Sequence, residues 1–214
     1  VINIGKNVNN FFVGDAVYGQ GAVYAGGTGA FAEELVASAG KIAKKPQNAD
    51  FLEAAALPLA GVSAVQALET HIGLKKGQKI LIHGGAGGIG HIAIQIAKAL
   101  GAYVATTVGG DDLDFVTKLG ANEAIDYKVV KFYEKLKGFD AVFDTVGAET
   151  LNNSFSVLKK GGIIVSMASA PSEELAKKFG VRVIGQNTEG NTARLARLAS
   201  LVDTGKVKVN IDKI

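Results

Sequence analysis

Along residues 79–184, short runs of apolar residues alternate with segments in which apolar residues recur at the helical period. Short apolar runs predict strands at 79–83, 103–107, 123–126, 139–144, 161–167 and 181–184. Segments with the helical period, several opened by Asp or Ser and closed by Gly, predict helices at 91–100, 111–119, 129–137, 147–158 and 172–180. Strands and helices that alternate with short connections predict an α/β fold with a doubly wound parallel sheet, which binds ligands at the carboxyl ends of its strands.

Residues before this alternation follow other patterns. The first 45 residues are β-like, with strand-like runs at 1–4 and 11–18, a glycine-rich loop at 19–29, and a run at 30–37 whose period fits helix or strand. Residues 48–72 have the helical period, and the pair Asp50 and Glu53 is typical of a helix cap. Because Pro58 and Gly61 interrupt this segment, we expect two helices that meet at 57–63.

The end of the chain adds a helix at 191–204 and an alternating run at 207–211, which is typical of a half-exposed strand. Together the outer segments contain too few strands to bury a core unaided. We therefore expect 1–45 and 206–214 to pack on each other as the remnant of a β-domain.

Five glycines occupy the seven residues from Gly84 to Gly90. Gly85, Gly87 and Gly90 fit G-x-G-x-x-G between a predicted strand and a predicted helix, the context that gives this motif its meaning. One glycine makes the tight turn, the next lets backbone N–H groups approach a pyrophosphate, and the third lets helix and strand pack closely. The helix N-terminus adds a partial positive charge, so the segment predicts dinucleotide binding.

Composition excludes several classes of protein. Hydrophobic residues make up 48% and charged residues 20% of the 214 residues, as in ordinary soluble proteins. The net charge of +3 is dispersed, which argues against nucleic-acid binding. The longest apolar stretch, 54–68, is interrupted by Pro58 and Gly61, so we expect no membrane span. The chain has no cysteine, which fits a reducing cytoplasm and excludes disulfides and thiolate metal sites.

The sequence resembles the zinc-free quinone oxidoreductases of the medium-chain dehydrogenase/reductase superfamily. The matching segments cover nearly the whole chain: GDAVYG at 14–19, EAAALPLAGVSAVQAL at 53–68, HGGAGGIGHIAIQIAKALGA at 83–102, LGANEAIDY at 119–127, FDTVGAETL at 143–151, KKGGIIVSM at 159–167 and LVDTGKVKVNID at 201–212. The resemblance implies a Rossmann domain at 48–189, part of a GroES-like catalytic domain at 1–47, and a helix and strand at 190–214 that return to it. We expect Val1 not to be the natural start, because the resemblance implies that the family's first half of the GroES-like domain precedes it. The catalytic residues therefore stay unassigned.

The resemblance also implies a set of cofactor-binding positions. Ser63 matches a hydroxyl near the nicotinamide, and Tyr127 matches a position beside the 2′-phosphate of NADPH. The pyrophosphate loop corresponds to Gly85, Ala86, Gly87, Gly88 and Ile89, and the strand ends contribute Thr107, Gly109, Val146, Gly147, Ser166, Met167 and Ala168. For Val146 and Met167, core packing is an equal alternative.

The cofactor preference follows from the second strand of the βαβ unit. An NAD-binding enzyme has an acid about 20 residues past the glycine motif, where this chain has Thr106 to Gly109. The missing acid and Tyr127 favour NADPH over NADH. Against this, the family's usual basic residue is absent, and Asp111 and Asp112 stand in the loop, where they are expected to cap a helix.

The candidate chemistry is hydride transfer without a metal. The three histidines, His71, His83 and His91, have no metal-ligand spacing. His83 is expected to pack beneath the loop, and Asp144 to bond a loop rather than to act as a base. Quinones and α,β-unsaturated carbonyls delocalise the added charge and need less polarisation than ketones. The alternatives are an enoyl-thioester reductase and a non-catalytic nucleotide-binding protein; a homodimer is typical of the resemblance.

Overall fold

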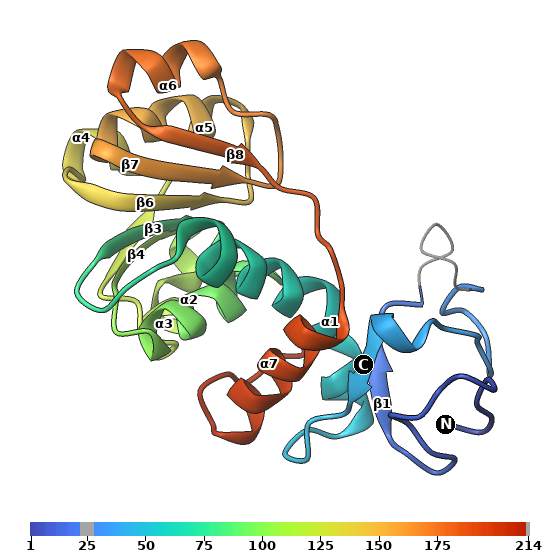
Figure 1. The fold of residues 1–214 in the computed structure, drawn as a ribbon. Helices are drawn as coiled ribbons and strands as arrows, with labels where there is room; N and C mark the ends of the chain where they lie inside the picture. Colours follow the sequence, from blue (N-terminus) through green and yellow to red (C-terminus); the bar gives the residue numbers. More distant parts are fainter. Residues whose placement is uncertain (22–27, 213–214) are drawn as a thin grey trace. The chain divides into compact units, whose positions relative to one another are not determined.

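The computed structural model describes residues 1–21 and 28–212, so residues 22–27 of the predicted glycine-rich loop lie outside the described residues. The chain divides into two compact units. The terminal unit consists of Val1–Val62 and Thr188–Ile214, and the sheet unit consists of Ser63–Asn187. Figure 1 shows the ribbon with its elements labelled.

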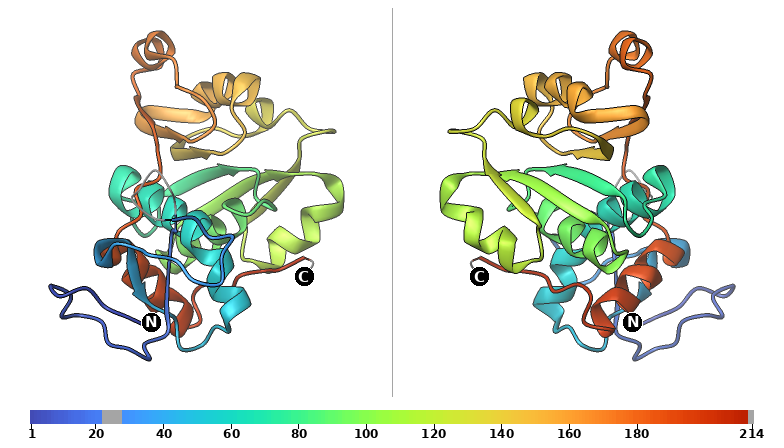
Figure 2. Two further views of the ribbon diagram at one scale, coloured as in Figure 1. Left: turned by 90° about the vertical axis from the view of Figure 1, so that its right-hand side faces the viewer. Right: turned by 90° about the vertical axis from the view of Figure 1, so that its left-hand side faces the viewer.

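Six parallel strands form the centre of the sheet unit (Figures 1 and 2). They are β3 (Lys79–His83), β4 (Tyr103–Val108), β5 (Glu123–Asp126), β6 (Phe139–Asp144), β7 (Leu158–Ser166) and β8 (Arg182–Gly185), in the order β5-β4-β3-β6-β7-β8. This is the order of a Rossmann fold, and it confirms the predicted doubly wound sheet. The strand order reverses between β3 and β6, so the ligand crevice of such a sheet lies beyond the carboxyl ends of these two strands.

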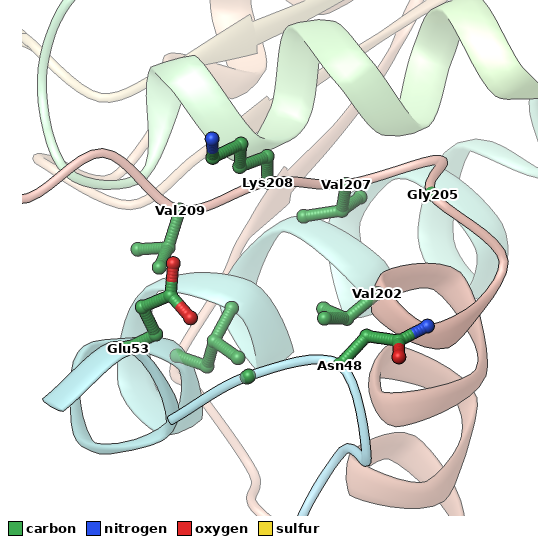
Figure 3. A pocket seen from close by; sticks show the side chains of 9 residues that line it. Asn48, Glu53, Val202, Gly205, Val207, Lys208 and Val209 are labelled. Carbon is green, nitrogen blue, oxygen red and sulfur yellow. The ribbon is translucent and has the colours of Figure 1, made fainter. Parts of the chain in front are cut away.

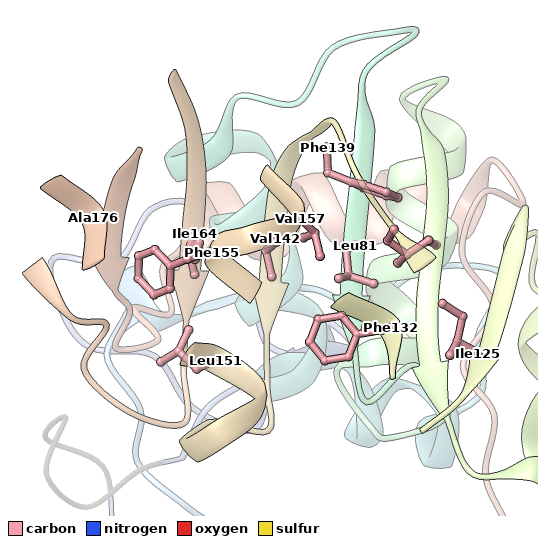
Figure 4. Close-up of a cluster of buried hydrophobic side chains, with 12 residues drawn as sticks. Leu81, Ile125, Phe132, Phe139, Val142, Leu151, Phe155, Val157, Ile164 and Ala176 are labelled. Atoms are coloured by element: carbon pink, nitrogen blue, oxygen red, sulfur yellow. The ribbon is translucent and has the colours of Figure 1, made fainter. Parts of the chain in front are cut away.

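Helices cover both faces of the sheet. The helix α2 (Gly90–Ala99) and the helix α3 (Leu113–Lys118), with the short 3₁₀ turn η4 (Gly110–Asp112), follow β3 and β4. The opposite face is covered by α4 (Phe132–Lys135), α5 (Ala148–Ser154) with η5 (Phe155–Val157), and α6 (Glu173–Phe179). Figure 4 shows the core on this second face, where Leu81, Val142 and Ile164 of the strands contact Phe132, Leu151 and Phe155 of the helices.

Local signals fix many of the element ends as predicted. The Ser172 hydroxyl accepts a hydrogen bond from the Leu175 amide at the start of α6, and Gly180 ends that helix with a φ of 65°. Asn191 caps α7 (Thr192–Asp203) by accepting from the Arg194 amide. These residues satisfy backbone groups that a helix end leaves unpaired, which is why the sequence marks them.

The terminal unit contains little regular β-structure. A two-stranded antiparallel sheet joins β1 (Val17–Gly19) to β2 (Ile42–Lys44), preceded by the turn η2 (Ala39–Lys41). The Thr192 hydroxyl at the start of α7 donates to the carbonyl oxygens of Ala39 and Ile42. The predicted strand at 1–4 does not form, and the run at 30–37, whose period fits helix or strand, forms neither. The run at 11–18 contributes only its last residues.

The predicted strand at 207–211 does not form either. Residues 1–62 and 188–214 belong to one compact unit, and direct packing of this run on residues 1–45 stays a prediction. The side chains of Val207 and Val209 are buried, and both line a cavity of about 270 Å³ with Glu53 and Val202 (Figure 3). The alternation in the sequence therefore reports alternate burial of an extended segment, which needs no strand partner.

The predicted break at 57–63 is wrong. The helix α1 (Phe51–Val65) runs through Pro58 and continues as the π-helical segment η3 (Gln66–Ile72). Proline inside a helix costs about 3 kcal/mol, but Ala54, Leu57 and Val62 of α1 are almost fully buried, and packing outweighs this loss. The predicted cap is confirmed, since the amides of Asp50 and Glu53 each donate to the other's carboxylate, at 3.0 and 2.8 Å.

The continuous helix also corrects the expectation that no run reaches the length of a membrane span. Among the described residues, Phe51–Ile72 is long and apolar enough by length and composition. Of its most apolar window, 61% is buried inside the protein, as is common for a core helix.

Three further helices are shorter than predicted. The segment 111–119 divides into η4 and α3, and 129–137 forms only α4, while α5 ends at Ser154. The Asp112 side chain makes no capping hydrogen bond at α3, contrary to expectation. The backbone of Asp112 is instead part of the preceding 3₁₀ turn.

We predict that Leu81→Ala lowers the free energy of unfolding by about 2–5 kcal/mol, because Leu81 is fully buried in the core on the second face. Urea denaturation measures the change. The matched control is Val129→Ala, since Val129 is 80% exposed and its truncation should cost below about 0.5 kcal/mol. Equal losses for the two variants would contradict the packing described.

Candidate functional site

The glycine loop from Gly84 to Ile89 lies at the carboxyl end of β3, directly before α2. The Gly85 amide donates to the Thr107 carbonyl at 3.1 Å, and the Gly87 amide donates to the Gly84 carbonyl at 3.0 Å. Gly84 has a φ of 70°, a conformation that favours glycine. The loop is therefore a tight turn bonded to β4.

Each motif glycine has its own steric reason. A Cβ on Gly85 would collide with the Thr106 hydroxyl, and a Cβ on Gly90 would collide with the Gly84 carbonyl oxygen. A Cβ on Gly87 would lie 3.3 Å from that same oxygen. The first and third glycines thus allow the close packing of loop, strand and helix that the motif predicts.

Gly88 differs from these three, because a Cβ built there meets nothing within 4 Å. A side chain at Gly88 would therefore clash with no other part of the protein. The glycine instead leaves the space beside the loop open. In the part of the chain that the structure describes, the N–H groups of Gly88 and Ile89 donate to no protein acceptor. Ile89 occupies the N-cap of α2 without a side-chain capping bond. Open space beside unpaired amides at a helix N-terminus fits an anionic group.

A network of buried polar side chains lies next to the loop, at the end of β3. The His83 imidazole bonds through Nδ1 to the Thr107 hydroxyl and through Nε2 to the Ser154 hydroxyl, both at 2.9 Å. The ring is fully buried and stacks edge-on against Phe132, with centroids 4.6 Å apart. Burial lowers the pKa of His83 to about 4, although the nearby Asp144 carboxylate opposes the shift. His83 is therefore a neutral packing residue, as predicted.

His91 contributes to the loop as well, since its Nδ1 lies 3.0 Å from the Gly87 carbonyl oxygen. Its backbone amide donates to the same oxygen. Both contacts anchor the first turn of α2 to the loop.

Asp144 is a loop-bonding carboxylate at the carboxyl end of β6, as expected. It accepts hydrogen bonds from the amides of Val146 and Gly147 and from the Ser166 hydroxyl, at 2.7–3.1 Å. Gly147 has a φ of 79°, and a Cβ there would lie 2.9 Å from that of Ala168. The network joins the loops that follow β6 and β7, and it fully buries the carboxylate.

The predicted site residues on these loops divide by exposure. Val146 is 53% exposed, Met167 is half-buried and Ala168 is exposed, so core packing does not explain Val146. Ser166, Thr107 and Ser63 are buried, and the hydroxyls of the first two belong to the supporting networks. The Ser63 carbonyl accepts from the Gln186 side chain at 3.0 Å; a place for Ser63 beside the nicotinamide stays a prediction.

A second corner of the site lies where β4 and β5 end. Val108 pairs with Asp126 in the sheet, and Tyr127, which follows, is 60% exposed. Gly109 and Gly110 directly follow the last residue of β4. Sequence reasoning missed Lys128, because only the pairing of β5 with β4 brings it near Gly109.

The comparisons with known proteins identify the family. Residues 88–179 match the model described as zinc-binding dehydrogenase. The chloroplast envelope quinone oxidoreductase homolog of Arabidopsis thaliana is 33% identical over 229 residues, which cover 99% of this chain and 68% of that protein. The chain belongs to the quinone oxidoreductase family.

Other members of the family agree with this assignment. The quinone oxidoreductase of Coxiella burnetii superposes with a TM-score of 0.84 at 36% identity, over 99% of this chain and 67% of that one. The Escherichia coli quinone oxidoreductase complexed with NADPH gives 0.83 at 28% identity, over 98% and 70%. The 2-methylene-furan-3-one reductase of Solanum lycopersicum is 35% identical over 218 residues. The match covers 99% of this chain but only 53% of that relative, so the chain spans about half of its length.

We predict that a methyl group destabilises the protein at one glycine of the loop and has almost no effect at another. Gly85→Ala should lower the free energy of unfolding by about 1–3 kcal/mol, because its Cβ collides with Thr106. Gly88→Ala should change it by less than about 0.5 kcal/mol, since its Cβ enters open space. Denaturant unfolding of both variants measures the difference, and equal losses would contradict this loop geometry.

We also predict a pH dependence caused by His83. Between pH 6.5 and about 4 the unfolded chain binds a proton at this residue and the folded chain does not, so stability falls as the pH falls through this window. The loss should reach about 3 kcal/mol. Unfolding of the wild type and of His83→Gln at several pH values measures it. The variant should lose less across the window, and parallel curves would contradict the assignment.

Proposed function

We propose that this chain is part of an NADPH-dependent oxidoreductase that transfers hydride to a quinone or an α,β-unsaturated carbonyl without zinc. The observation that carries the proposal is the open space at Gly88, next to unpaired amides at the switch point of the sheet. Steric crowding within the protein explains why residues 85 and 90 are glycine, but it does not explain the glycine at position 88. A bound dinucleotide explains it, because the pyrophosphate needs this space.

The residues of the loop fit a dinucleotide in a definite orientation. The amides of Gly88 and Ile89 would donate to the pyrophosphate, and the dipole of α2 would favour its negative charge. Val146, Met167 and Ala168, which follow β6 and β7, would line the nicotinamide end. Asp144 would hold these loops in place by its buried hydrogen bonds rather than touch the cofactor.

The bound nicotinamide would supply a hydride, and the acceptor must tolerate the charge it gains. The sequence has no cysteine, and no group of three or more potential metal ligands occurs among the described residues. A quinone or an enone spreads the added charge onto oxygen and so needs little polarisation by a metal. The names of the relatives, a quinone oxidoreductase homolog and a furanone reductase, support this class of acceptor.

We predict that NADPH binds about tenfold more tightly than NADH, a difference of about 1.4 kcal/mol. Gly88→Val should abolish the binding of both nucleotides, because its side chain fills the space for the pyrophosphate. Fluorescence titration measures affinity, and thermal unfolding shows that the variant is folded. Undiminished binding by a folded Gly88→Val protein would contradict this site.

Turnover separates the proposed enzyme from its alternatives. The full-length natural protein should consume NADPH with a small quinone or an enone, and this activity should survive prior treatment with a chelator. Consumption with an enoyl thioester only would favour the enoyl-thioester reductase. NADPH binding without consumption on any of these acceptors would favour a non-catalytic nucleotide-binding protein.

A further inference from the structure

The turn that follows β5 is tied to the end of β4 by backbone hydrogen bonds. The Tyr127 amide donates to the Val108 carbonyl at 3.1 Å, and the Lys128 amide donates to the Asp126 carboxylate at 2.9 Å. The amide of Val130 donates back to the Asp126 carbonyl at 2.9 Å. The backbone from which the Lys128 side chain projects is therefore fixed next to the end of β4.

Side chains of opposite charge meet above the glycines that end β4. A Cβ built on Gly109 would lie 4.0 Å from the Lys128 Nζ and 3.9 Å from an Asp112 carboxylate oxygen. A Cβ built on Gly110 would lie 2.7 Å from an Asp126 carboxylate oxygen. These residues, Gly109, Gly110, Asp112, Asp126 and Lys128, form what we call the β4–β5 corner.

Neither Lys128 nor Asp112 has a structural partner that explains its position. Among the residues that the structure describes, the Lys128 ammonium group forms no ion pair, and Asp112 does not cap α3 with its side chain. Asp126, in contrast, already accepts the Lys128 amide and so stabilises the turn. The two side chains left for a ligand are one cation and one carboxylate.

The end of the second strand in a Rossmann fold is where the adenine ribose binds, and the charge at this place distinguishes NADPH from NADH. A cation attracts the 2′-phosphate, whereas a carboxylate accepts hydrogen bonds from a 2′-hydroxyl and repels a phosphate. The loop itself contains no basic residue, since it reads Gly109-Gly110-Asp111-Asp112. Among the described residues, the only cationic group within 4 Å of a Cβ built on Gly109 is the Lys128 ammonium group, which comes from the turn after the neighbouring β5.

We propose that Lys128 determines the preference for NADPH by binding the 2′-phosphate, and that Asp112 opposes it. The inference rests on the proposed nucleotide site and adds the residues that select between the two nucleotides. Attraction and repulsion within one corner give a moderate preference rather than an absolute one, because the phosphate gains one cationic contact while the carboxylates of Asp112 and Asp126 lie nearby.

The test measures NADPH and NADH affinities by fluorescence titration for the wild type and for single variants. Lys128→Ala should weaken NADPH binding about five- to tenfold and change NADH binding by less than about twofold. Asp112→Asn should strengthen NADPH binding about threefold and leave NADH binding equal or weaker. Added salt should reduce the NADPH preference of the wild type more than that of Lys128→Ala.

The matched control is Lys177→Ala, which removes the same charge from an exposed position on α6, beside the opposite edge of the sheet. Its nucleotide preference should equal that of the wild type. An unchanged preference in Lys128→Ala, or an equal loss for both nucleotides, would overturn the inference while leaving the proposed function intact. A folded wild type that binds neither nucleotide would overturn the proposed function itself, and this inference with it.

Discussion

The carbonyl oxygen of Gly84 faces the first residue of α2 so closely that no side chain fits at Gly90. This approach places the helix N-terminus directly at the end of β3, and the loop between them has to turn within a few residues. The same crowding continues at Gly85, which packs against the Thr106 hydroxyl. While backbone crowds Gly85 and Gly90, the amides of Gly88 and Ile89 donate to no acceptor among the described residues, which leaves them available to the proposed ligand.

Such a loop needs support, since glycine adds no side-chain contacts of its own and costs conformational entropy on folding. The support comes from two buried polar networks at the strand ends. The neutral His83 joins β3 to Thr107 on β4 and to Ser154 on α5. Asp144 joins the loops after β6 and β7 through their amides and the Ser166 hydroxyl. Buried polar groups of this kind are stable only when fully bonded, so they hold the strand ends in one arrangement.

The sequence predicted the elements whose signals are local. The bounds of β3, β5 and β6, the capping residues of α6 and the extent of α7 agree with prediction, because apolar runs and capping residues act within a few positions. The glycine loop was also predicted correctly, because its sequence lies between a predicted strand and a predicted helix. Two local patterns gave wrong predictions. At Pro58, burial of the helix against distant segments outweighed the low helix propensity of proline. At 207–211, alternate burial of an extended segment produced the same alternating pattern as a strand.

The β4–β5 corner was not predictable for a related reason. Lys128 lies far from Gly109 in sequence, and its proximity depends on the register in which Val108 pairs with Asp126. A shift of this register by one residue would turn each side chain of β5 to the opposite face of the sheet. The corner therefore depends on an edge strand of four residues, Glu123–Asp126, whose end is secured by the Asp126 carboxylate. Asp126 would serve the proposed nucleotide site indirectly, because it fixes the turn that carries Lys128 beside Gly109. A carboxylate at this corner would in this way support the binding of a phosphate.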